Sequence, residues 1–246
     1  MTDLFIPAAP KDYNKLPYIL KTVAKHVPDI KRAFVVSPDG VKVEFSAFPV
    51  TSLKDSEVLD IDRTRFAYRP NWIFQQMLKL FQTVTDDWYM VIDSDRFFNR
   101  RVDLWQDGKP VMLMLSYDQE HGPYFTFNQK MFGFGKTYPH SFLSECTLYS
   151  RTLILEMLDT HGYDTPKEFI EAATHVIDGG CYPAESELYG SWIWKEHPKL
   201  YTFKTIKAIF GGKYGGEKYT DKEIEQAIAE RKPQDVDVFS LHSLEG

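Results

Sequence analysis

The chain is poor in cysteine and carries no excess of basic residues. Its 246 residues include only two cysteines, Cys146 and Cys181, in no spacing typical of a metal site. Neither a disulfide framework nor a zinc centre is therefore expected, and a reducing cytoplasm fits best. Lysine and arginine together number 29 against 35 acidic residues, which gives a net charge of −6. This balance argues against a nucleic-acid partner.

Long apolar runs are absent as well. No stretch approaches the roughly 20 apolar residues that a membrane-spanning helix needs, so any membrane contact is expected to be peripheral. The first residues, Met-Thr-Asp-Leu-Phe-Ile-Pro, lack the basic segment and the apolar run of a signal peptide. Because no internal repeat, low-complexity tract or linker divides the chain, residues 1–246 are predicted to form a single domain.

What the chain does contain is a periodic pattern typical of an α/β fold. Residues 3–8 read as a short buried strand, residues 14–27 as an amphipathic helix and residues 33–36 as a second strand. This β-α-β order is typical of a nucleotide-binding, Rossmann-like sheet. Residues 41–47 alternate apolar and polar, as a half-buried strand does, and a helix is predicted over residues 71–84.

Capping residues and apolar runs mark further elements. Ser150 can cap a helix, and Thr165 and Thr220 each begin a capping box with a glutamate three residues later. Apolar runs predict strands over residues 111–115 and 236–241. The aromatic share of 15% is high, and such side chains either fill a core or line a sugar-binding cleft.

An acidic pair follows a continuous apolar run. Residues 88–92 have the length of a buried strand, and Asp93-Ser94-Asp95 comes directly after it. Functional groups in open α/β sheets collect at the carboxyl ends of strands, and two carboxylates in this spacing can converge on Mg²⁺ or Mn²⁺. Such a metal neutralises a leaving diphosphate. A solvated turn is the alternative. A phosphatase-like nucleophilic aspartate is less favoured, because that motif normally follows the first strand of its fold.

A second acidic pair, Glu185 and Glu187, lies shortly after the turn Asp178-Gly179-Gly180. If a helix begins here, its N-terminus holds both carboxylates near positive dipole charge. An inverting glycosyl transfer needs one carboxylate to deprotonate the attacking hydroxyl. We take Glu187 as the candidate base, with Glu185 hydrogen-bonding the acceptor or organising the site. The alternative is a helix start that carries acidic residues for capping alone.

Three segments, taken in order, resemble one family. Residues 72–80, Trp-Ile-Phe-Gln-Gln-Met-Leu-Lys-Leu, are similar to its Gly-Trp-x-x-Gln-Gln-x-x-Lys-Leu helix, which precedes a strand ending in Asp-x-Asp, here Asp93 and Asp95. Residues 141–149, Ser-Phe-Leu-Ser-Glu-Cys-Thr-Leu-Tyr, resemble its Ser-Phe-Ile-x-Glu-His-Met-Leu-Phe. Residues 185–190 are similar to its Ser-Glu-Tyr-Glu-Leu-Tyr-Gly. The family is a group of GT-A-like glycosyltransferases found in bacteria and viruses.

The resemblance covers roughly residues 60–195. It implies a GT-A-type, Rossmann-like single domain with a mixed, mainly parallel sheet flanked by helices. It also implies a nucleotide-sugar donor and a metal. We expect a UDP- or GDP-sugar donor, Mn²⁺ or Mg²⁺ and a carbohydrate acceptor, in surface polysaccharide or glycan synthesis. The candidate base favours inversion, but the motifs leave the stereochemistry open. Asn71 and Cys146 replace the family's usual glycine and histidine, which puts the role of that histidine in doubt here. A non-catalytic carbohydrate- or nucleotide-binding protein of the same fold is the alternative.

The implied fold points to further binding residues. Gln76 and Lys79 precede the metal strand and could reach the donor, since a lysine charge suits a diphosphate. Arg63 could contact the base or a phosphate. Ala8 and Asp12 lie near the first strand, where donor nucleotides rest in this fold. The alternatives are a solvated helix face for Gln76 and Lys79 and a surface ion pair for Arg63.

His242 follows the last predicted strand. A late histidine completes the metal site in many GT-A enzymes, so His242 is expected to join Asp93 and Asp95 as a ligand. A frayed C-terminus is the alternative. Ser94, between the aspartates, is counted with the cofactor-binding residues. Four aromatic residues could stack on acceptor sugars or pack in the core: His140, Tyr189, Trp192 and Trp194.

Overall fold

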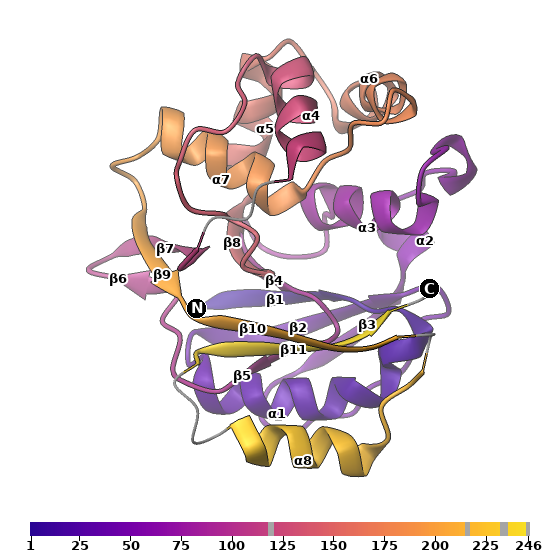
Figure 1. The fold of residues 1–246 in the computed structure, drawn as a ribbon, viewed down its shortest axis with the longest axis vertical. Coiled ribbons are helices and arrows are strands. Elements are labelled where there is room, and N and C mark those ends of the chain that lie inside the picture. Colours follow the sequence, from indigo (N-terminus) through magenta and orange to yellow (C-terminus); the bar gives the residue numbers. More distant parts are fainter. Residues whose placement is uncertain (118–120, 215–216, 232–235, 245–246) are drawn as a thin grey trace.

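A five-stranded mixed sheet forms the centre of the molecule (Figure 1). The computed structural model describes residues 1–117, 121–214, 217–231 and 236–244. The strand order is β3-β2-β1-β4-β8, in which the first four strands are parallel and β8 is antiparallel to β4. These strands are β1 (Thr2–Pro7), β2 (Ile30–Ser37), β3 (Val50–Lys54), β4 (Trp88–Ile92) and β8 (Cys146–Ser150).

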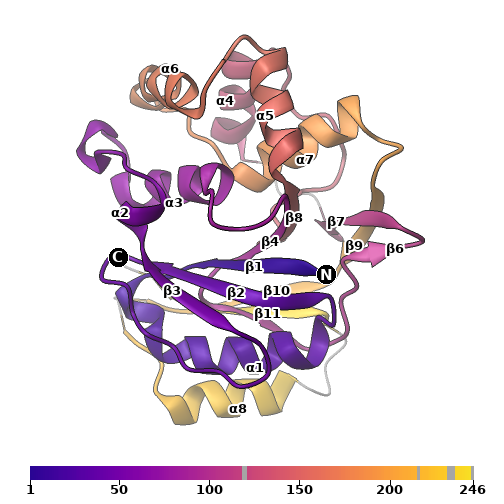
Figure 2. The same ribbon diagram turned by 180° about the vertical axis from the view of Figure 1, so that it is seen from behind.

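Helices cover both faces of this sheet, as Figures 1 and 2 show from opposite sides. One side carries α1 (Leu16–His26) and α8 (Asp221–Arg231). The other side carries α3 (Pro70–Phe81), α4 (Gly122–Phe132), α5 (Arg151–Thr160), α6 (Pro166–Asp178) and α7 (Glu185–Glu196). Shorter helices are η1 (Pro10–Lys15), α2 (Asp55–Val58) and η2 (Arg63–Arg65). None of the helices in these described ranges is long and apolar enough to cross a bilayer.

The strands separate two hydrophobic cores. Phe5 of β1 packs with the helices α3 to α7, whereas Leu4 and Ile6 pack with α1. Successive residues of a strand point to opposite faces, so a sheet covered on both sides needs apolar residues at every position. This requirement explains the continuous apolar sequences of β1 and β4.

Two three-stranded sheets flank the central one. The first has the order β10-β11-β5 and consists of β5 (Arg96–Phe98), β10 (Ala208–Tyr214) and β11 (Val238–Leu244). The second has the order β6-β7-β9 and consists of β6 (Trp105–Gln106), β7 (Lys109–Leu115) and β9 (Thr202–Ile206). Because β11 pairs with β5, and Leu241 N donates to Asp95 O (3.0 Å), the C-terminal strand lies against the segment that leaves β4.

The structure confirms the predicted α/β fold with a mixed, mainly parallel sheet flanked by helices. The strand predicted over residues 88–92 is β4, and the helix predicted over residues 71–84 is α3, with Pro70 at its first position. Ser150 caps α5 by accepting from Leu153 N. The alternating pattern over residues 41–47 does not form a strand in the structure. The edge of β2 pairs instead with β3, which comes later in the chain.

Gly190 in α7 provides a direct test of this packing. A Cβ at Gly190 would lie 2.8 Å from Phe142 Cβ and closer still to the Phe142 ring, which is fully buried. We expect Gly190→Ala to destabilise the protein by ~2 kcal/mol or more despite its better helix propensity, with a fall in Tm of roughly 5 °C. Gly122→Ala, at the start of α4 where a Cβ has no neighbour within 4 Å, is the matched control. Equal Tm values for the two variants would contradict the packing of Phe142 on α7.

Candidate functional site

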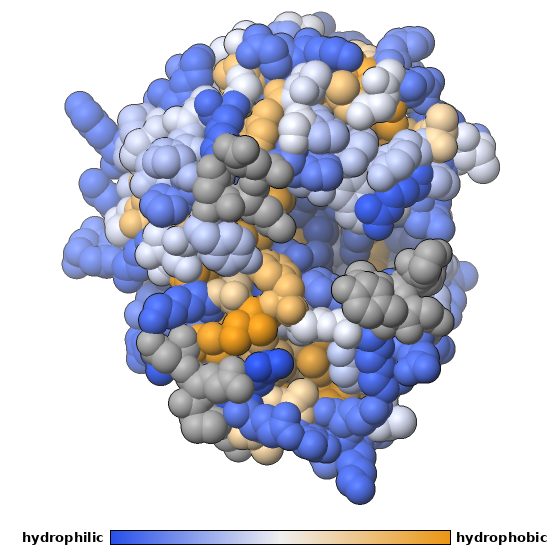
Figure 3. Space-filling model, in the orientation of Figure 1, coloured by the Kyte–Doolittle hydropathy of each residue, from blue (hydrophilic) through white to orange (hydrophobic). Residues whose placement is uncertain are grey.

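A cavity of about 320 Å³ lies at the carboxyl end of β4. Figure 3 shows a recess near mid-height of the molecule, between the group of helices α3 to α7 and the layer of β10 and β11. The helical wall consists of Trp72, Gln76, Lys79, Tyr124, Ala184, Glu185 and Ser186, and the opposite wall of Asp93, Leu143, Glu145, Phe210 and His242. Three carboxylates, one lysine and one histidine therefore meet here, on segments between Trp72 and His242.

Lys79 joins three elements at this cavity. Its Nζ lies 2.6 Å from Asp93 Oδ1 and 2.9 Å from Glu185 Oε1, and the residue is only 3% exposed. Burial by itself lowers the pKa of Lys79, but the two carboxylates outweigh it and the pKa is raised. Burial raises the pKa of Glu185, against the opposing charge of Lys79. Gln76 Oε1 accepts from Glu185 N (3.4 Å), so α3 holds the start of α7 at two points.

Asp95 and His242 form a second pair. His242 donates from Nδ1 to Asp95 Oδ2 (2.9 Å). Burial by itself raises the pKa of Asp95, but the hydrogen bond and charge of His242 outweigh it and the pKa is lowered. The pKa of His242 is raised, because the hydrogen bond and negative charge of Asp95 exceed the opposing effect of burial. Asp95 is therefore an ionised carboxylate, as the sequence prediction of a ligand requires.

Asp12 and Ser94 support this pair from behind. Ser94 donates to Asp12 Oδ2 (3.1 Å), and Lys15 donates to Asp12 Oδ1 and to Leu241 O, both at 2.6 Å. Burial raises the pKa of Asp12, with Lys15 opposing. The two residues do meet near Asp95, as predicted for a shared site. Neither lines the cavity, however, because both are buried in this network, so the prediction that they contact the donor is corrected to a supporting role.

Glu145 is the cavity residue that the sequence reasoning missed. It forms an ion pair with the buried Arg96 and accepts from Ser240 Oγ (3.1 Å), with its backbone at φ +54°. Burial raises the pKa of Glu145; Arg96 opposes this, and the nearby carboxylates of Asp93 and Asp95 add to it. The available signal was its place in the Ser-Phe-x-x-Glu segment, which matches the resembled family. Only the fold shows that this glutamate faces the acidic pair.

Glu187, the predicted base, does not reach the cavity. It is 1% exposed, and its Oε2 accepts from Phe142 N (2.9 Å) and Ser141 Oγ (3.2 Å). Its Oε1 accepts from Ser191 Oγ (3.3 Å). The catalytic prediction for Glu187 is therefore wrong in geometry: this carboxylate holds the 141–142 segment against α7. Its neighbour Glu185 is the one that faces the cavity.

Two other predicted donor residues also lie outside the cavity lining. Arg63 pairs with Asp55 and lies 4.1 Å from the ring centroid of Phe74. Ala8 is buried, and its N donates to Val36 O (2.8 Å). The predicted contacts of Arg63 and Ala8 with a nucleotide are thus not supported. Of the candidate acceptor aromatics, Tyr189 and Trp192 are core residues.

Carboxylate oxygens of Asp93 and Asp95 that have no hydrogen-bond partner indicate whether a divalent cation fits at this site. Asp95 Oδ1 is buried and has no hydrogen-bond partner among the residues that the structure describes. Within the same residues, no three His, Cys, Asp or Glu side chains converge to hold a metal by themselves. Mg²⁺ is commonly held by one or two carboxylates, with phosphate and water completing its shell. The residues therefore fit a cation shared with a phosphate-bearing ligand.

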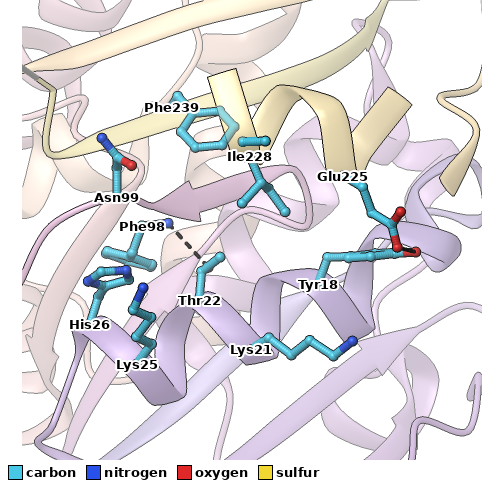
Figure 4. Close-up of a pocket in the computed structure, with 11 residues that line it drawn as sticks. Tyr18, Lys21, Thr22, Lys25, His26, Phe98, Asn99, Glu225, Ile228 and Phe239 are labelled. Carbon is cyan, nitrogen blue, oxygen red and sulfur yellow. Dashed lines mark hydrogen bonds between the residues drawn. The ribbon is translucent and has the colours of Figure 1, made fainter. Parts of the chain in front are cut away.

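A second cavity, of about 310 Å³, lies between α1 and α8. Figure 4 shows side chains of α1, among them Thr22 and Lys25, pointing toward the side of the cavity where Ile228 of α8 and Phe239 of β11 lie. Its one lining carboxylate, Glu225, accepts from Tyr18 OH (3.3 Å). No group of carboxylates converges in this lining, so the cavity at β4 is the better candidate for chemistry.

The fold and the cavity together define an α/β protein with an acidic, lysine-bridged cavity at the carboxyl edge of a mixed sheet. The chain belongs to a family of unknown function, DUF6492, which matches residues 7–171. The matched region contains Asp93, Asp95 and Glu145, whereas Glu185 and His242 lie beyond it. None of the curated proteins compared with the chain matches it.

The buried Glu187 generates a pH-dependent stability. Burial raises the pKa of Glu187 to about 7, so the folded state binds this proton more tightly than the unfolded chain. The stabilisation of the folded state by protonated Glu187 is complete below the usual glutamate pKa and is lost as the pH rises to about 7. We expect the free energy of unfolding to fall by on the order of 3 kcal/mol from pH 5 to pH 8, relative to Glu187→Gln. Urea unfolding measures this slope.

The control for this experiment is Glu196→Gln, on the same helix, where the side chain is exposed. This variant should keep the pH slope of the wild-type protein. A Glu187→Gln variant with an unchanged slope would show that Glu187 is ionised throughout, and the assignment would be withdrawn.

Proposed function

We propose that this protein is a GT-A-type glycosyltransferase that moves a sugar from a UDP- or GDP-sugar to a carbohydrate acceptor with inversion. The observation that carries the proposal is the position of Asp93 and Asp95, beside His242, at the carboxyl end of β4. In doubly wound sheets this is the edge where ligands bind. The β-α-β opening of the sheet and the ordered motif resemblance support the same function.

In this proposal Asp93 and Asp95 would hold Mn²⁺ or Mg²⁺ together with the donor diphosphate. His242, predicted from the sequence as a third ligand, would orient Asp95 through its hydrogen bond. The bound cation supplies charge neutralisation for the leaving diphosphate. Lys79 orients Asp93 and Glu185 through its two ion pairs. Because the lysine is already paired with two carboxylates, its role is positioning the site and not binding phosphate.

Glu185 replaces Glu187 as the proposed general base. It lines the cavity at the first position of α7, and burial raises its pKa, which makes its carboxylate a stronger proton acceptor. Its carboxylate takes the proton of the acceptor hydroxyl while the new glycosidic C–O bond forms. The bond from the anomeric carbon to the diphosphate oxygen breaks in the same step.

Asp95→Asn should remove metal-dependent stabilisation by nucleotides. Thermal unfolding with MnCl₂ and a panel of UDP, GDP and their sugars measures it. A ligand at 100 times its Kd adds ~2.7 kcal/mol, or roughly 5–10 °C in a chain of this size. Asp103→Asn, at an exposed aspartate paired with Arg101, is the matched control and should keep the full shift. A shift of equal size in Asp95→Asn would remove Asp95 from the donor site.

Glu185→Gln should leave the nucleotide-dependent Tm shift nearly intact and lower kcat by roughly 10²–10⁴. Glu187→Gln, two residues along the same helix, should keep kcat within a few-fold of wild type, because its side chain does not reach the cavity. Transfer to an acceptor mixture, with detection of released nucleoside diphosphate, measures both. The reverse ranking of the two variants would return the base to Glu187. Nucleotide binding without any turnover would instead favour a non-catalytic binding protein.

A further inference from the structure

A group of partly exposed aromatic rings continues the helical wall of the cavity. It consists of Tyr68, Trp72, His121, Tyr124 and Tyr182, which we call the aromatic wall. The Tyr68 and Tyr182 rings stack at 4.6 Å, Trp72 meets Tyr182 edge-on at 5.6 Å, and Trp72 and Tyr124 are parallel at 6.2 Å. The rings come from the segment before α3, from α3, from the start of α4 and from the segment before α7.

The aromatic wall runs from the inside of the cavity to the outer surface. Trp72 and Tyr124 line the cavity beside Gln76 and Glu185. Tyr68, at the other end, is 38% exposed, and the remaining rings are half-buried. Core tyrosines such as Tyr89 are fully buried. The wall is therefore only partly buried: Trp72 and Tyr182 pack against the core, and the rings also contact one another along the wall.

Polar contacts hold these rings in place. His121 Nε2 and Tyr182 OH are hydrogen-bonded at 2.9 Å. The guanidinium of Arg69 lies 5.1 Å from the Trp72 ring centroid, and the Arg69 backbone is left-handed, at φ +40°. That conformation is uncommon for a residue with a side chain and persists only where the surrounding structure holds it. A rigid surface of this kind binds a ligand with a smaller loss of conformational entropy.

The chemistry of the wall and of its neighbours selects the ligand. A pyranose ring has an apolar C–H face that packs on aromatic faces, and hydroxyls that bind carboxylates and amides. Glu185 and Gln76 provide those polar partners at the inner end. Without a bound cation, the carboxylates of Asp93 and Glu145 on the opposite wall disfavour a ligand that is itself an anion. Since the wall extends past the cavity to Tyr68, it is longer than one sugar ring.

We propose that the aromatic wall binds an uncharged oligosaccharide chain, whose terminal hydroxyl reaches Glu185 and whose following sugars lie toward Tyr68. This inference rests on the proposed function for the reaction at that terminus, and it names the acceptor as a carbohydrate chain, in preference to a single sugar. The binding itself needs neither the metal nor the nucleotide.

Binding of defined hexasaccharides tests the wall. Isothermal titration with cellohexaose, chitohexaose and an α1,6-mannohexaose should find at least one that binds the wild-type chain, and its disaccharide should bind at least tenfold more weakly. Tyr68→Ala and Tyr182→Ala should each raise the Kd about tenfold. Tyr18→Ala, in the cavity between α1 and α8, is the matched control and should change nothing. Saturation-transfer NMR should show contacts at the sugar C–H protons.

The remaining outcomes separate the wall from the transferase. Asp95→Asn should keep hexasaccharide binding while it loses the Mn²⁺–nucleotide shift. If the protein binds a hexasaccharide through Tyr68 but binds no nucleotide, oligosaccharide binding at the aromatic wall is supported and the glycosyltransferase function is refuted. Failure of all three hexasaccharides to bind, or binding unaffected by Tyr68→Ala and Tyr182→Ala, would overturn the wall. A lower affinity for UDP in Tyr68→Ala would also overturn the proposal, because the aromatic wall would then bind the uracil of the nucleotide.

Discussion

Burial of a single ammonium group, that of Lys79, is the constraint on which the rest of the site depends. A lysine at this depth is stable only with charged partners, and it finds them in Asp93 and Glu185. The end of β4, the middle of α3 and the start of α7 must therefore come together in one arrangement. Loss of both carboxylates would leave the buried ammonium uncompensated, and an uncompensated buried charge typically costs 3–5 kcal/mol. One cation between two anions also leaves the cavity acidic, which suits a site that recruits a metal ion.

A second buried lysine, Lys15, organises the other side of the acidic pair. It binds Asp12 and the carbonyl of Leu241, so the N-terminal segment and the C-terminal strand are held behind Asp95. His242 and Asp95 lie 147 positions apart in the sequence and still form a hydrogen bond. Groups that hydrogen-bond to a ligating side chain in this way fix the orientation of that side chain. The acidic pair is therefore supported by buried hydrogen bonds and is not a solvated turn.

The fold also connects the structural glutamate with the cavity. Glu187 accepts from the backbone of Phe142, and Phe142 packs on Gly190 in the same helix. The segment held in this way continues to Glu145, which turns toward the acidic pair in a left-handed backbone conformation. Burial of one carboxylate in α7 thus positions another carboxylate at the cavity. This connection accounts for the two glutamates near the start of α7 without giving both a place in the chemistry.

The sequence by itself determined several elements, among them β4, α3 and α5, and the acidic pair, because apolar periodicity, Pro70 and the Ser150 cap act over a few neighbouring residues. Only the tertiary structure decided which glutamate meets the cavity: Glu185 and Glu187 are two residues apart in the chain but about 200° apart around a helix. Likewise, the partners of His242 and Glu145 come from distant segments, and no local pattern encodes such contacts. Long-range packing brings these charges together, so their roles could be read only from the fold.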